Sequence, residues 1–217
     1  MGASITGSNT LYTPSQLPVQ DLTSVFYAFA NVLPDGTVAS SNPFVDTQFN
    51  FAAVNKQRKN RFDARSTEDV EEDAAELEKR QTGGNVQGAV QQLFSFKAQQ
   101  RSLKVILAVG GTVPGASANF SAAASTPTTR AQFAATAVQL VTDWGMDGIG
   151  IDWAFPSTAT DAANLLSLIA ATRAAFNNYS LVNGLNYQFF ISVPLQSNST
   201  IYQYLDLPAL APLVNNW

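Results

Sequence analysis

Runs of apolar residues alternate along the chain with segments in which apolar residues recur every three or four positions. The runs are rich in β-branched and aromatic residues, and most are bounded by glycine or proline, which is typical of buried strands. The expected strands are 24–31, 103–110, 146–155 and 186–194, and another one starts at 213–217. Helical spacing predicts helices at 86–97, 130–144 and 161–176, with a short irregular helix at 201–210.

The segments between these elements are expected to be loops. One loop is predicted at 37–50, and a polar one runs from the end of the second strand to Pro127. Thr128 or Thr129 is expected to cap the helix that follows, because a threonine hydroxyl can accept a hydrogen bond from a free backbone N–H group.

The alternation of strands and helices indicates right-handed parallel βαβ units. Two α/β architectures fit: an open doubly wound sheet, or all or part of a (β/α)₈ barrel. No Gly-x-Gly-x-x-Gly or phosphate loop follows an expected strand, so the nucleotide-binding form of the open sheet lacks its fingerprint. In a barrel, functional residues lie at the C-terminal ends of the strands, where we expect Asn31, Gly110–Gly111 and Asp152.

The segment from Trp144 to Pro156 is the one around which the chain is organised. Its strand ends at Pro156, which cannot donate a ladder hydrogen bond. Strand alternation separates two faces: Gly150, Asp152 and Ala154 on one, and Ile149, Ile151 and Trp153 on the other. Because a carboxylate inside an apolar strand is costly to bury without a partner, Asp152 is a candidate for chemistry, and a satisfied structural carboxylate is the equal alternative.

Composition narrows the chemistry that the chain can perform. The 217 residues include no histidine and no cysteine, which excludes Ser-His and Cys-His catalysis, disulfides and thiolate sites. A net charge of -4 argues against nucleic acid or an anionic membrane as the main partner. No metal or organic cofactor is implied. No apolar run is long enough to span a bilayer, and residues 1–6 lack the pattern of a signal peptide.

A charged segment at about 55–82 departs from the composition of the rest of the chain. It is basic at first and then acidic, with a thin apolar stripe, and we interpret it as a solvated surface insertion; the dibasic pair Lys79–Arg80 leaves a processing loop as the alternative. Sequons for N-glycosylation occur at Asn119, Asn178 and Asn198, and they matter only if the chain is secreted.

The central segment resembles the signature of glycoside hydrolase family 18, the chitinases and their relatives. That signature is Asp-x-x-Asp-x-Asp-x-Glu, usually followed by Tyr-Pro. Asp147 and Asp152 match its first and third acidic positions, whereas Gly150 replaces the second Asp and Ala154 replaces the Glu. The resemblance to fungal members covers roughly 15–217 without the charged insertion. The matching segments are Tyr27–Asn31, Leu103–Gly111, Asn119–Ser125, Arg130–Pro156 and Phe190–Pro194.

The resemblance implies a single partial catalytic domain over residues 1–217, an incomplete TIM-type (β/α)₈ barrel. Met1–Thr13 matches the family's first strand poorly, and the chain ends inside the expected sixth strand, before the family's Met-x-Tyr-Asp segment. Hydrolysis in this family is retaining and substrate-assisted. By position, Asp152 orients the substrate's acetamido group and Ala154 stands where the general acid should be, so we expect no meaningful chitinase activity.

Three functional hypotheses follow from the resemblance. The first is a chitin-binding or chito-oligosaccharide-binding pseudoenzyme, in which Asp152 holds an acetamido group and Phe29, Trp153 and Phe155 are candidate sugar platforms. Trp153 is on the opposite face from Asp152, which favours a core residue there. The second is a degenerate, non-functional fragment. It is favoured by further losses such as Ala108 and Thr112, which replace the family's Ser and Trp. The third is an active endochitinase whose acid has moved to Asp46 or Asp161. The family also implies secretion.

Overall fold

The computed structural model describes residues 14, 17–51, 87–195 and 202–217. They fall into two compact units. The sheet unit comprises 21–41, 102–195 and 202–217, and the helical unit comprises 14, 17–20, 42–51 and 87–101. Compactness does not test independent folding, so a single domain over residues 1–217 stays a prediction. The expected insertion at about 55–82, Asn198 and the segment Met1–Thr13 lie outside the described residues.

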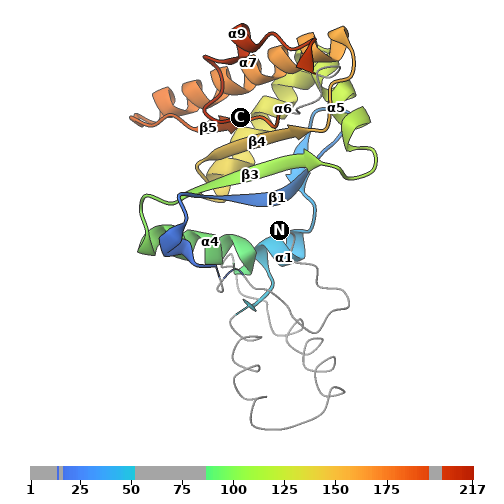
Figure 1. Cartoon of the computed structure of the whole chain (residues 1–217). Coiled ribbons are helices and arrows are strands. Elements are labelled where there is room, and N and C mark those ends of the chain that lie inside the picture. Colours follow the sequence, from blue (N-terminus) through green and yellow to red (C-terminus); the bar gives the residue numbers. More distant parts are fainter. Residues whose placement is uncertain (1–13, 15–16, 52–86, 196–201) are drawn as a thin grey trace, which may run out of the picture. The chain divides into compact units, whose positions relative to one another are not determined.

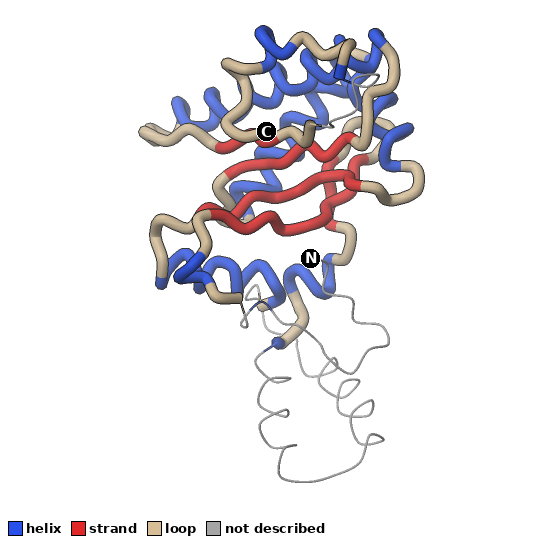
Figure 2. Tube along the Cα trace, viewed as in Figure 1, coloured by secondary structure: helices blue, strands red, loops and turns tan. Residues whose placement is uncertain are grey.

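A five-stranded sheet in the order β2-β1-β3-β4-β5 forms the centre of the sheet unit (Figure 1). The strands are β1 (Ser24–Val32), β2 (Val38–Ser40), β3 (Lys104–Gly111), β4 (Gly148–Trp153) and β5 (Phe190–Ser192). β1, β3, β4 and β5 run parallel, and β2 folds back antiparallel on β1. Figure 2 shows the strands side by side as one sheet, which within the described residues does not close on itself.

Helices follow β3, β4 and β5 along the chain, and those after β4 and β5 and the longer one after β3 were expected from the sequence. They are α5 (Ala116–Ser125), α6 (Pro127–Asp143), α7 (Ala159–Val182) and the short α9 (Leu207–Leu210). α5 and α6 pack on the strands, and α7 packs on α5 and α6. In this core the ring of Phe120 stacks on Trp153 with centroids 5.6 Å apart and also contacts Phe133. β3 is buried from Val105 to Gly111, in keeping with its continuous apolar run.

Two of the loops expected from the sequence contain secondary structure instead. α5 lies within the segment predicted as a polar loop before Pro127, because its alanines favour a helix and Phe120, Ala123 and Ala124 bury one side of it. The predicted loop at 37–50 contains β2 and α1 (Pro43–Thr47). Here the Asn42 side chain accepts a hydrogen bond from the N–H group of Val45 at 3.2 Å and so caps α1.

The start of α6 is also corrected by the structure. The cap is Thr126, not Thr128 or Thr129, and its hydroxyl accepts a hydrogen bond from the N–H group of Thr129 at 3.1 Å. The hydroxyl of Thr129 in turn accepts a hydrogen bond from the N–H group of Thr126, which completes a capping box. Pro127 at the first helical position is the sequence signal that identifies this start.

The helical unit consists of α1 and α4 (Gly88–Gln99), and a short 3₁₀ helix, η2 (Val19–Asp21), precedes β1 along the chain. α4 matches the helix expected at 86–97. Its first residue must be glycine because a Cβ atom at position 88 would lie 2.1 Å from the carbonyl oxygen of Asp46 in α1. In the part of the chain that the structure describes, no helix has the length and apolar content needed to cross a bilayer.

Arg173 fastens the C-terminal segment to β5. This α7 side chain is 4% exposed, and it donates to the carbonyl oxygens of Phe189 and Leu213 and to Oδ1 of Asn215. The same Oδ1 accepts from the N–H group of Ile191. The strand expected at 213–217 appears here as one parallel bridge between Ser192 and Asn216. Arg173 therefore sets the register in which the chain returns beside β5.

Replacing Arg173 by Met keeps an unbranched side chain and removes all these donors. We expect the free energy of unfolding to fall by about 2 kcal/mol, because buried carbonyl groups lose their partners. Urea unfolding followed by circular dichroism measures the change. The matched control is Arg101→Met at an exposed position, with an expected change below about 0.5 kcal/mol. Equal stability of the two variants would contradict the role given to Arg173.

Candidate functional site

Asp152 lies at the C-terminal end of β4, where the sequence places a functional residue in a parallel barrel. The register of β3 against β4 sets Gly110 beside Asp152 and Gly111 beside Trp153. Asn31, the other residue expected at this end of the sheet, is exposed near the end of β1. The predicted grouping of Asn31, Gly110–Gly111 and Asp152 at the C-terminal ends of their strands is confirmed.

The carboxylate of Asp152 is partly buried and has no hydrogen-bond or ion-pair partner among the described residues. Burial raises the pKa of this carboxyl group above its ordinary value, because the charged form loses solvation. The residues two positions before and after Asp152 are Gly150 and Ala154, and its register partner on β3 is Gly110. Asp152 is thus not a satisfied structural carboxylate, and its charge remains available to a ligand.

Two phenylalanine rings of β1 lie close to this part of the sheet. Phe26 is 40% exposed, and its ring lies 3.5 Å from the position that a Cβ atom would take on Gly150. Phe29 is 37% exposed and packs against Gly111, where a Cβ atom would lie 2.8 Å from the ring. Sequence analysis proposed Phe29 but missed Phe26. β3 lies between β1 and β4, and the register places the glycines of β4 beside β3. Only this register shows that the ring of Phe26 can lie near β4.

The other two proposed platforms differ in exposure. Phe155, just after β4, is partly exposed. Trp153 is 2% exposed, its ring stacks on Phe120, and its indole N–H group donates to Oγ of Ser117 at 3.1 Å. This geometry is that of a satisfied core tryptophan, the alternative that strand alternation already offered. We therefore keep Phe155 and leave Trp153 out of the candidate sugar surface.

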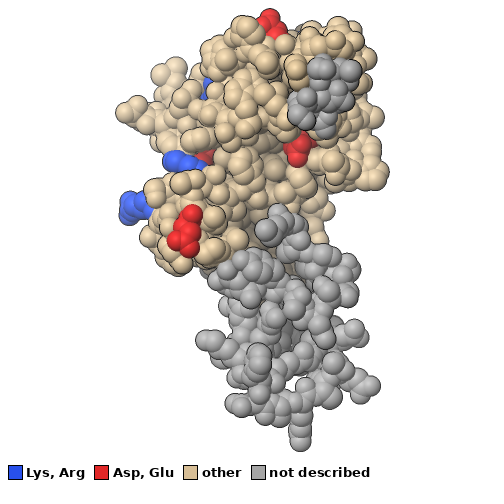
Figure 3. Space-filling view, viewed as in Figure 1, with Lys and Arg blue, Asp and Glu red and all other residues tan. Residues whose placement is uncertain are grey.

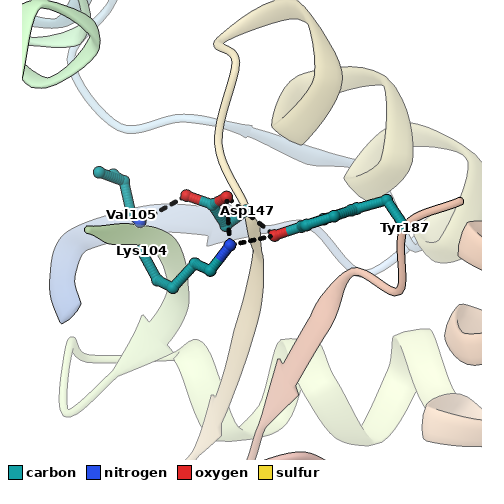
Figure 4. A network of polar contacts seen from close by, with 4 residues as sticks. All are labelled: Lys104, Val105, Asp147 and Tyr187. Atoms are coloured by element: carbon teal, nitrogen blue, oxygen red, sulfur yellow. Dashed lines mark hydrogen bonds and ion pairs between the residues drawn. The ribbon is translucent and has the colours of Figure 1, made fainter. Parts of the chain in front are cut away.

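Asp147, the other acidic residue proposed for the site, directly precedes β4, at the opposite end from Asp152. Figure 4 shows its carboxylate among Val105, Lys104 and Tyr187. Asp147 is 6% exposed. One carboxylate oxygen accepts from the N–H group of Val105 and the other from the hydroxyl of Tyr187, each at 2.8 Å. The ammonium of Lys104 lies 3.6 Å from Asp147 and donates to the Tyr187 hydroxyl at 3.2 Å. Burial, and then the carboxylate of Asp147, raise the pKa of Tyr187 well above its ordinary range, which keeps the phenol protonated.

The backbone of Asp147 strengthens the same junction. Its N–H group donates to the carbonyl of Val105, and its carbonyl accepts from the N–H group of Phe190. Asp147 therefore joins β3, β4 and β5 where these strands begin. Asp147 is five residue steps from Asp152 along the strand, which corresponds to about 16 Å. The structure does not bring the two carboxylates together, and the contacts of Asp147 are those of a structural residue.

Neither of the two positions considered for a relocated acid presents a free carboxylate to solvent. Both carboxylate oxygens of Asp161 accept hydrogen bonds, from Ser121 at 2.8 Å and from Thr158 at 3.0 Å. The same residue completes the cap of α7, because its N–H group donates to Thr158. Asp46 is 6% exposed in α1 of the helical unit, so its carboxyl group has little access to solvent.

Two of the three sequons lie in the described residues. The side-chain amide of Asn119 donates to the carbonyl of Val32 at 2.9 Å, which ties α5 to β1. Asn178 is exposed on α7, although the hydroxyl of Ser180 in the same sequon is buried and donates to the carbonyl of Tyr187. Glycosylation stays a prediction at both positions.

Charged groups are sparse around the site. Figure 3 shows one face of the molecule, on which the described acidic and basic side chains are few. Within the residues covered by the structure, no three Asp, Glu, His or Cys side chains gather as a metal site would require. A single carboxylate beside exposed aromatic rings can hold a polar ligand and stack against its apolar faces, but it supplies no second acid–base group.

Comparisons with known proteins agree with the resemblance seen in the sequence. The family model described as glycosyl hydrolases family 18 matches residues 4–216. Chitinase 1 of Aphanocladium album is 33% identical over 204 residues, which are 94% of this chain and 42% of that protein. Endochitinase 1 of Metarhizium anisopliae gives the same identity and the same shares. The chain thus spans less than half the length of these curated relatives.

Solved structures show the same fold. An immunomodulatory active chitinase from Trichuris suis superposes with a TM-score of 0.70 at 21% identity, over 98% of this chain and 46% of that chain. A chitinase-like agglutinin from Robinia pseudoacacia gives 0.68 at 22% identity, over 94% and 51%. The predicted fold class, an incomplete TIM-type barrel of parallel strands and helices, is confirmed, with the sheet of the described residues not closed.

Replacing Asp147 by Asn tests its structural assignment. One amide oxygen cannot accept from both Val105 and Tyr187, so we expect the free energy of unfolding to fall by about 2 kcal/mol. Any affinity for sugar should stay unchanged, because the residue is at the far end of β4 from Asp152. Thermal and urea unfolding measure the first effect, and calorimetric titration measures the second.

The matched control is Asp143→Asn, which neutralises an exposed carboxylate in the last turn of α6. It should leave stability within about 0.5 kcal/mol of the parent chain. An Asp147→Asn variant as stable as this control would show that the junction of the three strands does not depend on the carboxylate.

Proposed function

Because the chain belongs to glycosyl hydrolases family 18, we propose that it binds chito-oligosaccharides without cleaving them. One observation carries the proposal: Asp152 presents an unpartnered carboxylate at the C-terminal end of β4, while the position of the family's general acid holds Ala154. Asp152 would face the substituent at C2 of one sugar. Phe26, Phe29 and Phe155 would stack against sugar rings.

The loss of hydrolysis follows from the side chains that remain. Ala154 has no proton to give to the leaving oxygen, and the loss of a general acid typically costs about two to four orders of magnitude in rate. Gly150 removes the charged neighbour expected beside Asp152. Both carboxylate oxygens of Asp161 accept hydrogen bonds at the start of α7, and Asp46 is buried away from solvent, so neither supports the hypothesis of a relocated acid.

Several finer statements stay predictions. The fold is shared by an active chitinase and by a chitinase-like agglutinin, so fold alone does not decide between hydrolysis and binding. Secretion also stays a prediction, and so does the expectation that the chain binds neither nucleic acid nor membrane. A degenerate fragment without function is the alternative that the binding experiment must separate from a lectin-like protein.

A calorimetric titration of the 217-residue chain with chitohexaose is the direct test. We expect saturable heat, and mass spectrometry of the end-point mixture should show the hexaose intact. Asp152→Ala should weaken binding by about tenfold, the effect of one hydrogen bond to a charged group. Asp143→Ala, which removes an exposed carboxylate from α6, should bind as the parent chain does.

Each other outcome of this titration points to one of the alternatives. A folded chain that gives no heat would rule out the binding role and favour a degenerate fragment. Shortened oligosaccharides would show hydrolysis. In that case a pH–rate profile that loses one ionisation in Asp161→Ala would identify the relocated acid.

Restoring the two lost acidic positions should not restore hydrolysis in this chain. A Cβ atom at position 150 meets only ordinary contacts with Phe26 and Ala108, so Gly150→Asp does not clash there. The double variant Gly150→Asp with Ala154→Glu still has a site on one open sheet, because the sheet of the described residues does not close around the sugar. We expect no release of chitotriose above that of the parent chain, and measurable release would show that the open sheet suffices.

A further inference from the structure

The carboxylate of Asp152 has a negative charge that the described protein does not balance. The basic residues in the described part of the sheet unit are Lys104, Arg130 and Arg173. Lys104 pairs with Asp147 at the start of β3. Arg130 donates to the carbonyl of Ala124, and Arg173 donates around the end of β5. Each of these three cations has its contacts elsewhere, so within the described part of the sheet unit no side chain balances the charge of Asp152, and a cationic ligand would do so.

The surroundings of Asp152 favour such a charge. The carboxylate is partly buried, and attraction between opposite charges grows as water is excluded from between them. Its flanking residues Gly150 and Ala154 and its register partner Gly110 offer no hydrogen-bond donor from their side chains. Phe26 is 40% exposed, its ring lies 3.5 Å from the Cβ position of Gly150, and the face of an aromatic ring attracts an ammonium group.

The donor set does not suit a metal ion. Hard cations bind several oxygen ligands, and the described residues bring no second or third acidic side chain to Asp152. A sugar with a primary ammonium group needs only one carboxylate and can cover the aromatic rings with its apolar face.

We propose that this chain prefers oligosaccharides of glucosamine, whose C2 amino group is positively charged, over the N-acetylated oligosaccharides of the same length. This inference rests on the proposed function, since it concerns the substituent that Asp152 faces in the same site. It changes the ligand class from neutral to cationic. An acetamido group can donate one N–H to Asp152 but leaves the negative charge unbalanced, whereas an ammonium group supplies both the donor and the charge.

The experiment compares fully deacetylated glucosamine hexamer with chitohexaose by calorimetric titration, at a pH where the amino groups are protonated. The deacetylated hexamer should bind the parent chain at least about tenfold more tightly than chitohexaose. Its affinity should fall in high salt, because salt screens the attraction of exposed and partly buried charges. The affinity for chitohexaose, a neutral ligand, should change little with salt.

Two matched variants separate the site from the general acidity of the chain. Asp152→Asn keeps the shape of the side chain and removes its charge, so the preference for the deacetylated hexamer should disappear. Asp143→Asn removes one charge from the exposed end of α6 and should leave the preference intact. Equal weakening by both variants would mean non-specific attraction of a polycation to an acidic protein, and would overturn the proposal.

The two hexamers also separate this inference from the proposed function. Chitohexaose binding as tightly as its deacetylated form, or more tightly, would overturn the preference and support the chito-oligosaccharide binding role. A folded chain that binds neither hexamer would overturn both. The comparison of ligands on the parent chain needs no variant, so the proposal remains testable even if Asp152→Asn does not fold.

Discussion

The junction at Asp147 sets the geometry on which the rest of the sheet unit depends. The carboxylate of Asp147 accepts hydrogen bonds from the N–H group of Val105 and the hydroxyl of Tyr187. Its backbone N–H and carbonyl groups bond to Val105 and Phe190. These contacts fix how far β3, β4 and β5 are shifted along one another. The same register continues along β3 and β4 and sets Gly110 beside Asp152 at their other end.

The two acidic residues of the surviving signature therefore have different environments. Asp147 is surrounded by donors and has its charge used in holding strands together. Asp152 has glycine and alanine as flanking residues and no partner among the described residues. A buried structural carboxylate is stabilised by its contacts, whereas an unpartnered one is a cost that a ligand can offset. This contrast is the physical basis for assigning binding to one end of β4 and architecture to the other.

The substitutions at positions 150 and 154 change the chemistry without disturbing the strand. Gly150 pairs with Ala108 of β3 and Ser192 of β5, the ring of Phe26 lies near it, and Ala154 follows the end of β4. One carboxylate and exposed aromatic rings, without an acid at position 154, fit the recognition role that we propose. Because the fold is shared by chitinases and by a chitinase-like agglutinin, the side chains of the site and not the architecture decide its function.

The sequence by itself determined the family, the parallel α/β order and the position of Asp152, because long apolar runs and the spacing around Trp144–Pro156 are local signals. It could not identify α5 as a helix, since that segment is short and small residues dominate it. Only the tertiary structure assigned Asp147 to a junction, Asp161 to a helix cap and Trp153 to the core. It also revealed Phe26 beside Gly150. These assignments depend on which groups meet across strands and helices far apart in the chain, and no local pattern encodes that.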